Sequence, residues 1–129
     1  MQIAYVDTSI VVALALGEPA GVALRPVIEA LDEVCSSALL EAEFLATLAR
    51  EAVGDEPSHY LAPISWIFPR RRLSAEYKRA LRQGHLRGAD VHHVATALYV
   101  FPEPRGTLFV TLDQRQQQVA AALGFRTVP

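Results

Sequence analysis

The chain has 129 residues, of which 51% are hydrophobic and 20% charged, and its net charge is −2. These values predict one folded domain over residues 1–129 and argue against intrinsic disorder. The single Cys35 excludes an internal disulfide, residues 10–16 form an apolar run too short to cross a membrane, and no basic leader precedes Asp7, so we expect a cytoplasmic protein.

Apolar periodicity and turn residues divide the chain into alternating strands and helices. In chain order the patterns predict strand 2–6, helix 9–16, helix 20–31, strand 33–37, helix 38–52, helix 55–67, edge strand 70–73, helix 74–84, helix 88–100, strand 107–112, helix 113–124 and strand 125–128. Ser37 and Ser74 are expected to cap the helices that follow them, and Gly54 to stop the helix before it.

This alternation is typical of an α/β protein, a three-layer sandwich with a mainly parallel central sheet flanked by helices. Ligands of such sheets bind beyond the carboxyl ends of the strands. Asp7 follows the first predicted strand and Asp113 follows the strand over residues 107–112. We therefore expect both carboxylates at the same edge of the sheet.

Charge is distributed unevenly along the chain. Residues 1–56 hold ten acidic residues against two arginines, whereas residues 70–87 hold seven basic residues against Glu76. An acidic half beside a basic block suggests a cation site next to a surface that attracts phosphates. A solvated helix face is the alternative explanation of the basic block.

Four acidic residues occupy places that require an explanation. Asp7, Asp90 and Asp113 lie where helices are predicted to begin, so each could serve as a helix cap, as a functional group or as both. Glu43 has apolar neighbours three and four residues away and no basic partner. Because an unpaired buried carboxylate is costly, Glu43 requires a nearby cation or a place at the rim of a cleft, unless it is simply exposed.

Two histidines follow Asp90 in a segment whose composition is typical of a buried helix. We expect His93 to be a core histidine with one hydrogen bond rather than a residue that supports Asp90. His92 lies on a different helix face, and we expect it to be exposed.

Carboxylates that converge on one sheet edge cannot all be ionised unless something positive binds there. Hard divalent cations with oxygen ligands meet that need, so the acids suggest Mg²⁺ or Mn²⁺. Two such ions can activate water and stabilise the leaving oxygen in phosphodiester cleavage.

Four stretches resemble, in order, the motifs of PIN-domain ribonucleases, and most closely those of VapC-type toxins of bacterial toxin–antitoxin pairs. The stretches are YVDTSIVVALAL, SSALLEAEFLATLAR, LRGADVHHVATAL and FVTLDQRQQQVAAALGF. The resemblance assigns catalytic and metal-binding roles to four acids: Asp7, Glu43, Asp90 and Asp113. It assigns supporting roles to Thr8, Ser9, Thr111 and His93. Gln114 and Gln116 stand where some relatives carry a further acid, which leaves a second metal open.

The resemblance further implies an Mg²⁺- or Mn²⁺-dependent endoribonuclease that leaves a 5′-phosphate and a 3′-hydroxyl. It also implies a homodimer and a small antitoxin protein that inhibits it within a toxin–antitoxin hetero-oligomer. We place RNA backbone contacts in the basic block, at Arg79, Arg82 and above all Arg87, because positive charge supplies most of the non-specific affinity for nucleic acid.

Two alternatives remain at this level. An aspartate after a first strand is also the nucleophile of haloacid-dehalogenase-like phosphatases, but these usually have a second Asp where this chain has Ser9. The other alternative is a PIN-like domain that binds RNA or a protein partner without cutting RNA.

Overall fold

The computed structural model describes residues 1–52 and 56–128. The elements in chain order are β1 (Ile3–Val6), α1 (Thr8–Ala15), α2 (Pro19–Glu29), β2 (Glu33–Ser37), α3 (Ala38–Glu51), α4 (Pro57–Leu61), β3 (Ile64–Ile67), α5 (Ser74–Leu81), α6 (Gly88–Val100), β4 (Leu108–Val110) and α7 (Gln114–Ala122). The four strands form one parallel sheet in the order β3-β2-β1-β4. The predicted α/β class and the parallel sheet are confirmed.

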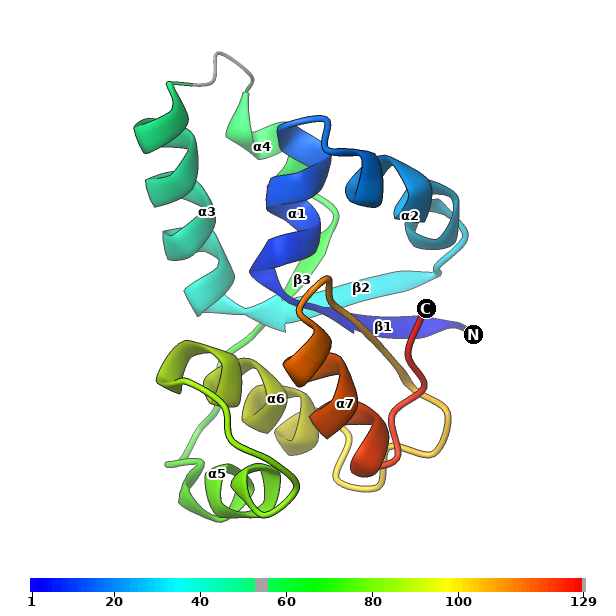
Figure 1. Cartoon of the computed structure of the whole chain (residues 1–129), viewed down its shortest axis with the longest axis vertical. Coiled ribbons are helices and arrows are strands. Elements are labelled where there is room, and N and C mark those ends of the chain that lie inside the picture. Colours follow the sequence, from blue (N-terminus) through cyan, green and yellow to red (C-terminus); the bar gives the residue numbers. More distant parts are fainter. Residues whose placement is uncertain (53–55, 129) are drawn as a thin grey trace.

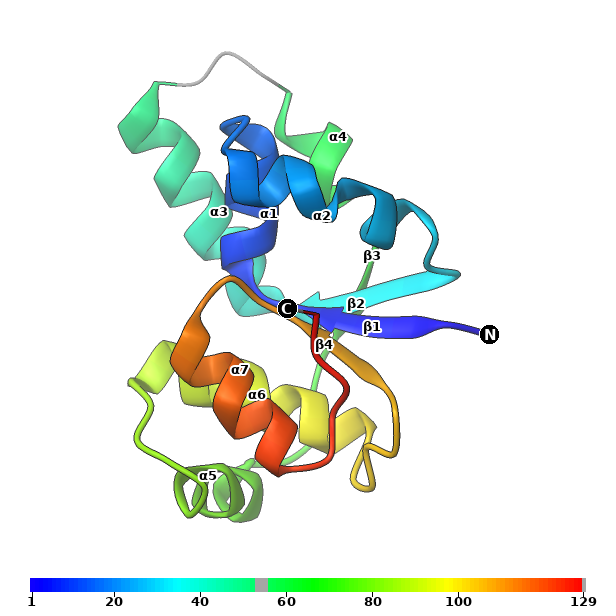
Figure 2. The same cartoon turned by 45° about the vertical axis from the view of Figure 1, so that its right-hand side comes forward.

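Helices cover both faces of the sheet, which gives three layers. Helices α1 to α4 lie on one side and α5 to α7 on the other (Figures 1 and 2). Successive side chains of a strand point to opposite faces, so β1 contributes to two cores. Ala4 and Val6 pack toward α1, α2 and α3, whereas Tyr5 packs toward α6 and α7. Cys35 is buried beside Tyr5, as expected of a small core residue.

The prediction for residues 55–67 is wrong in its second half. Helix α4 ends at Leu61, and residues 64–67 form β3, which pairs in parallel with β2. Pro63 lacks an N–H and cannot continue the helix, and the β-branched and aromatic run after it is suited to a strand. The start of the predicted helix at residue 55 and the predicted stop near Gly54 lie outside the described residues.

The segment predicted as an edge strand, residues 70–73, is an irregular bend that leads into α5. β3 already occupies that edge of the sheet. Leu73 is buried and stands at the N-cap position of α5, so Ser74 is the first helical residue and not the cap. The burial of Leu73, which anchors this bend, explains why an apolar residue follows three arginines.

The last predicted strand, residues 125–128, is reduced to one bridge between Leu108 and Arg126. The N–H of Phe109 donates to the carbonyl oxygen of Arg126 at 2.9 Å. Phe125 packs in the core against Phe109. The apolar pattern that suggested a strand therefore reflects a single buried aromatic residue and one pairing contact.

Within the described residues, no single helix has the length and apolar composition needed to cross a membrane. In the same part of the chain, α1 and α2 together have the required length and composition, but they meet at an angle of 110°.

Helices α1 and α2 approach so closely at Gly21 that only glycine fits. A Cβ at Gly21 would lie 2.7 Å from the carbonyl carbon and the Cβ of Ala13, and 2.9 Å from the backbone nitrogen of Leu14. We expect Gly21→Ala to lower the free energy of unfolding by about 1–3 kcal/mol, because backbone atoms must move apart. Urea unfolding measures this. Gly88→Ala is the matched control, since a Cβ there meets no atom within 4 Å, and equal stability of the two variants would contradict the account.

Candidate active site

The order of the strands creates a crevice at the carboxyl end of the sheet. The chain passes from β1 to β2 to β3 in one direction and then returns to place β4 on the other side of β1. Ligands of parallel α/β sheets bind at such a switch point. Asp7 directly follows β1, and Thr111 directly follows β4. The prediction that acids after these two strands share one edge is confirmed by the sheet order.

Asp7 is 4% exposed and accepts hydrogen bonds on both carboxylate oxygens. Ser9 Oγ donates to Oδ1 at 2.6 Å, and Thr111 Oγ1 donates to Oδ2 at 2.7 Å. The same two hydroxyls accept the backbone N–H groups of Leu112 and Asp113, each at 3.0 Å. Asp7 thus holds the segment that carries Asp113, and it makes no side-chain cap bond to α1.

Burial is the largest influence on the Asp7 carboxyl and raises its pKa. The hydrogen bonds from Ser9 and Thr111 oppose this, as does the electrostatic interaction with His93, and the charge of Asp90 adds to it. The ionised form of Asp7 is therefore held by two hydroxyl donors but lacks a full countercharge.

Asp113 and Asp90 meet at Gln116. Asp113 caps α7, since its Oδ1 accepts the N–H of Gln116 at 2.8 Å, so the capping role is confirmed for this acid. Asp90 lies in the first turn of α6, where Arg87 takes the N-cap position, so Asp90 is not a cap. The side-chain Nε2 of Gln116 instead donates to Oδ1 of Asp90 at 3.1 Å.

Gln116 is fully buried, and its Oε1 has no hydrogen-bond partner among the described residues. An orphaned buried acceptor costs about 1–3 kcal/mol. A glutamine at this buried position therefore lowers the stability of the fold. Its hydrogen bond to Asp90 is the feature that explains why a glutamine is present there.

The pKa of Asp90 is raised, first by burial, then by the negative charge of Asp113 and less strongly by that of Glu43. In the described part of the chain, neither lysine nor arginine forms an ion pair with Asp7, Asp90 or Asp113. Among the described residues these three acids therefore have no paired cationic side chain, although the electrostatic interaction with His93 opposes the rise in the pKa of Asp7 and of Asp90.

Glu43 stands at the rim of this site and has two partners. Its side chain is 34% exposed. Thr8 Oγ1 donates to its Oε1 at 2.7 Å, and Nε2 of His93 lies 3.1 Å from the same oxygen. The hydrogen bond with His93 is the main reason that the pKa of Glu43 is lowered. Simple surface exposure is thus not the explanation of this residue.

Both histidine predictions require correction. His93 is buried as expected, but it makes more than one hydrogen bond, with Tyr5 through Nδ1 at 2.7 Å and with Glu43 through Nε2. His92 is half-buried rather than exposed: its Nδ1 lies 2.9 Å from the Tyr77 hydroxyl and its Nε2 3.1 Å from Ser37 Oγ. Sequence spacing alone could not reveal these partners, which come from distant elements.

The four acids do not surround a single point. No three His, Cys, Asp or Glu side chains among residues 1–52 and 56–128 lie close enough together to hold one metal ion. The physical reason is that each acid is drawn to a local donor: Asp7 to Ser9 and Thr111, Glu43 to Thr8 and His93, Asp90 to Gln116, and Asp113 to the backbone of α7.

A cleft of about 420 Å³ opens beside two of the acids. Its lining residues are His85, Leu86, Arg87, Asp90, Asp113 and Arg115. The sequence predicted Arg87 as a phosphate contact but missed His85 and Arg115. The available signal for Arg115 was its place in the first turn of a helix that begins at the same sheet edge.

The other two predicted RNA contacts do not line the cleft. Arg79 donates to the carbonyl oxygen of Pro102 at 2.7 Å, which ties α5 to the end of α6. Arg82 follows α5 at its C-cap position and is exposed.

These features define an α/β protein with an acidic, arginine-lined cleft at the switch point of its sheet. Comparison with known proteins agrees with this class: residues 4–122 match the PIN domain. The chain therefore belongs to the PIN-domain family, whose members are generally nucleases, as the sequence motifs indicated. This assignment gives no support to the phosphatase alternative.

A solved structure shares the fold. VapBC-1 from nontypeable Haemophilus influenzae matches with a TM-score of 0.57 at 16% identity, over 98% of this chain and 98% of that chain. A search of curated proteins returned no match.

Proposed function

We propose that this protein is an Mg²⁺- or Mn²⁺-dependent endoribonuclease that acts as the toxin of a toxin–antitoxin pair. The observation that carries the proposal is the placement of Asp7, Asp90 and Asp113 at the switch point of a PIN-domain sheet, where burial first, and then the charge of a neighbouring carboxylate, raises the pKa of Asp7 and that of Asp90. Such mutual repulsion favours binding of a cation.

The donor set suits a hard divalent cation. Carboxylate oxygens supply the ligands, and Mg²⁺ is usually held by one or two carboxylates together with waters and substrate phosphate. The absence of a three-group cluster in the described residues is therefore compatible with such an ion. Asp90 and Asp113, which line the cleft, would hold it together with Asp7 and the rim residue Glu43, whose charges act on Asp90 or are acted on by it. When bound, the ion supplies an acidified water and charge neutralisation for phosphodiester hydrolysis.

The side chains around the acids orient them for this role. Ser9 and Thr111 hold Asp7, Gln116 holds Asp90, and Thr8 holds Glu43. Because donors fix each carboxylate before any ligand arrives, little ordering remains to be done upon binding.

Arg87 and Arg115 would bind the RNA phosphates, with His85 beside them in the same cleft. We expect Arg87→Gln and Arg115→Gln each to weaken RNA binding and to reduce the slope of log K against log salt by about 0.7, the value for one phosphate contact on a single strand. Filter binding in EDTA over a salt series measures this. Arg50→Gln is the control, because Arg50 lies at the far end of α3 and pairs with Glu51. An unchanged slope in both cleft variants would refute the assignment.

The proposed partners are an RNA substrate, a small antitoxin protein and a second copy of this chain, in the cytoplasm. The fold likeness to VapBC-1 and the PIN-domain motifs support the toxin–antitoxin part of the proposal. Expression together with the product of a small adjacent reading frame, followed by co-purification, tests it.

Cleavage of a mixed pool of structured RNA tests the enzymatic part. Purified protein, freed of any co-purified inhibitor, is incubated with Mg²⁺, Mn²⁺ or EDTA, and the end groups of the fragments are mapped. We expect cutting that requires the metal and leaves a 5′-phosphate and a 3′-hydroxyl. Tight RNA binding without turnover at saturating Mn²⁺ would instead favour a PIN-like domain that binds without cutting.

A further inference from the structure

Two tyrosine–histidine pairs connect α6 with its neighbours. The Tyr5 hydroxyl lies 2.7 Å from Nδ1 of His93, and the Tyr77 hydroxyl lies 2.9 Å from Nδ1 of His92. The pairs differ at the second ring nitrogen. Nε2 of His93 faces the candidate active-site acid Glu43 at 3.1 Å, whereas Nε2 of His92 faces the hydroxyl of Ser37. Only the first pair reaches a residue of the site.

The surroundings of Nε2 determine where His93 carries a proton. This nitrogen lies 3.1 Å from Oε1 of Glu43 and 3.2 Å from Oγ1 of Thr8. The Thr8 hydroxyl gives its one proton to the same Glu43 oxygen, at 2.7 Å. Both neighbours of Nε2 are therefore acceptors, so Nε2 must be the donor.

The surroundings of Nδ1 show that this second ring nitrogen of His93 accepts a hydrogen bond from Tyr5. The backbone N–H of Ser37 donates to the Tyr5 oxygen at 3.2 Å, so the hydroxyl proton of Tyr5 is available for another acceptor. In a neutral histidine ring that carries its proton on Nε2, Nδ1 is such an acceptor, and Nδ1 of His93 lies 2.7 Å away. Hydrogen bonds then run in one direction, from Ser37 through Tyr5 and His93 to Glu43.

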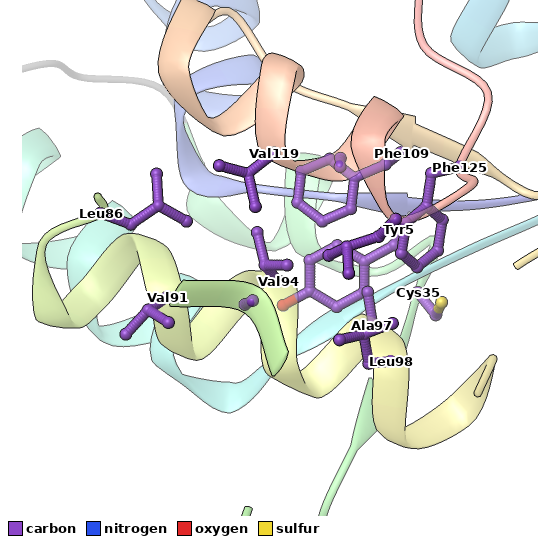
Figure 3. Close-up of a cluster of buried hydrophobic side chains, with 13 residues drawn as sticks. Tyr5, Cys35, Leu86, Val91, Val94, Ala97, Leu98, Phe109, Val119 and Phe125 are labelled. Carbon is purple, nitrogen blue, oxygen red and sulfur yellow. The ribbon is translucent and has the colours of Figure 1, made fainter. Parts of the chain in front are cut away.

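Packing fixes the Tyr5 end of this chain of hydrogen bonds. The Tyr5 ring is fully buried and stacks on Phe109 with centroids 5.2 Å apart and planes 14° from parallel. Figure 3 shows the ring enclosed by apolar side chains, including Val94 and Ala97 of α6. The hydroxyl can therefore not turn to solvent, and the acceptor 2.7 Å from it is Nδ1 of His93.

We propose that Tyr5 is a positioning residue that holds His93 in the Nε2–H tautomer and thereby fixes the Glu43 carboxylate at the rim of the active site. The role given to Glu43 rests on the proposed function, whereas the tautomer of His93 does not. An outer hydrogen-bond partner of a ligating group typically changes metal affinity or activity by 10–100-fold.

Nitrogen-15 NMR of the histidine rings tests the direction of the hydrogen bonds in metal-free protein at pH 8, where histidine is ordinarily neutral. We expect His93 to be the Nε2–H tautomer in the wild type and to remain so in Glu43→Gln, because Tyr5 still donates to Nδ1. In Tyr5→Phe/Glu43→Gln nothing donates to Nδ1, and the new glutamine can present either its oxygen or its NH₂ group to Nε2, so a mixture of tautomers is expected. An Nδ1–H tautomer of His93 in Glu43→Gln would overturn the proposal, since Tyr5 would then be an acceptor.

The functional consequence is measured with Tyr5→Phe, which removes one oxygen, beside the matched control Tyr77→Phe. We expect Tyr5→Phe to weaken Mn²⁺ binding and RNA cleavage by about 10-fold, and Tyr77→Phe to change His92 but neither His93 nor cleavage. Equal Mn²⁺ affinity of the two folded variants would overturn the positioning role. If neither the wild type nor the two tyrosine variants cleave RNA, the proposed function fails. The Nε2–H assignment of His93 still stands in that case, provided that the NMR experiment gives the expected tautomers.

Discussion

Replacing Asp7 with Asn is expected to lower metal-dependent RNA cleavage by at least about 100-fold, the loss typical when a preorganised charge is removed from an active site. Asp7 is the most deeply buried of the four acids and the one through which β1 and the segment after β4 are joined. The variant removes the negative charge while it keeps the size of the side chain.

The hydrogen bonds of Asp7 explain why Asp7→Asn is also expected to change the position of neighbouring residues. Ser9 and Thr111 each accept a backbone N–H and give their own proton to Asp7. An Asn places an NH₂ group against one of these donors, so Asp113 is expected to shift as well. Initial rates with Mn²⁺ measure the loss, and circular dichroism confirms the fold. Glu41→Gln, on the exposed side of α3, is the control; cleavage by Asp7→Asn at the rate of Glu41→Gln would rule out the assigned role.

Replacing Asp90 with Asn is expected to change function and stability in opposite directions. Cleavage should fall by about 100-fold or more, because a charge that faces the cleft is lost. The metal-free protein should become more stable, because Asp113 and Glu43 no longer repel a third negative charge. Oδ1 of the new Asn can still accept the hydrogen bond from Gln116, so the geometry is kept.

The stability gain has a defined dependence on pH. A carboxyl group whose pKa is raised by folding favours the folded state below the ordinary Asp pKa of about 3.9, and this contribution is lost as the pH rises through the raised value. Asp90→Asn does not titrate, so its melting temperature in EDTA should exceed that of the wild type at pH 7 and approach it at pH 4. With saturating Mn²⁺ at pH 7 the order should reverse. A lower melting temperature of the variant in EDTA at pH 7 would contradict the repulsion.

The positions of two acids could be predicted from sequence because they depend on local order alone. Asp7 and Asp113 follow strands of strong β character, and parallel strands end at one edge. Glu43 could be singled out because its helix neighbours are apolar. Its partners could not, because Thr8 and His93 belong to other elements and meet Glu43 only after α1, α3 and α6 have packed.

The errors in the fold arose where short segments carry little periodicity. β3 has four residues next to Pro63, and only its pairing with β2 distinguishes it from a helical turn. The cleft residues His85 and Arg115 were missed for a related reason: charged residues beside a helix start resemble a solvated surface until the opposite wall is placed. From the sequence, Gln116 stands only where some relatives carry an acid, and its contact with Asp90 depends on how α6 and α7 pack.

Calorimetric titration of the metal-free protein with Mn²⁺ tests most directly whether the acids at this sheet edge hold a divalent cation. The account predicts saturable binding to the wild type, and binding at least about 10-fold weaker in Asp7→Asn and in Asp90→Asn, with Glu41→Gln binding as the wild type does. The same Mn²⁺ affinity in the wild type and in both aspartate variants would contradict it.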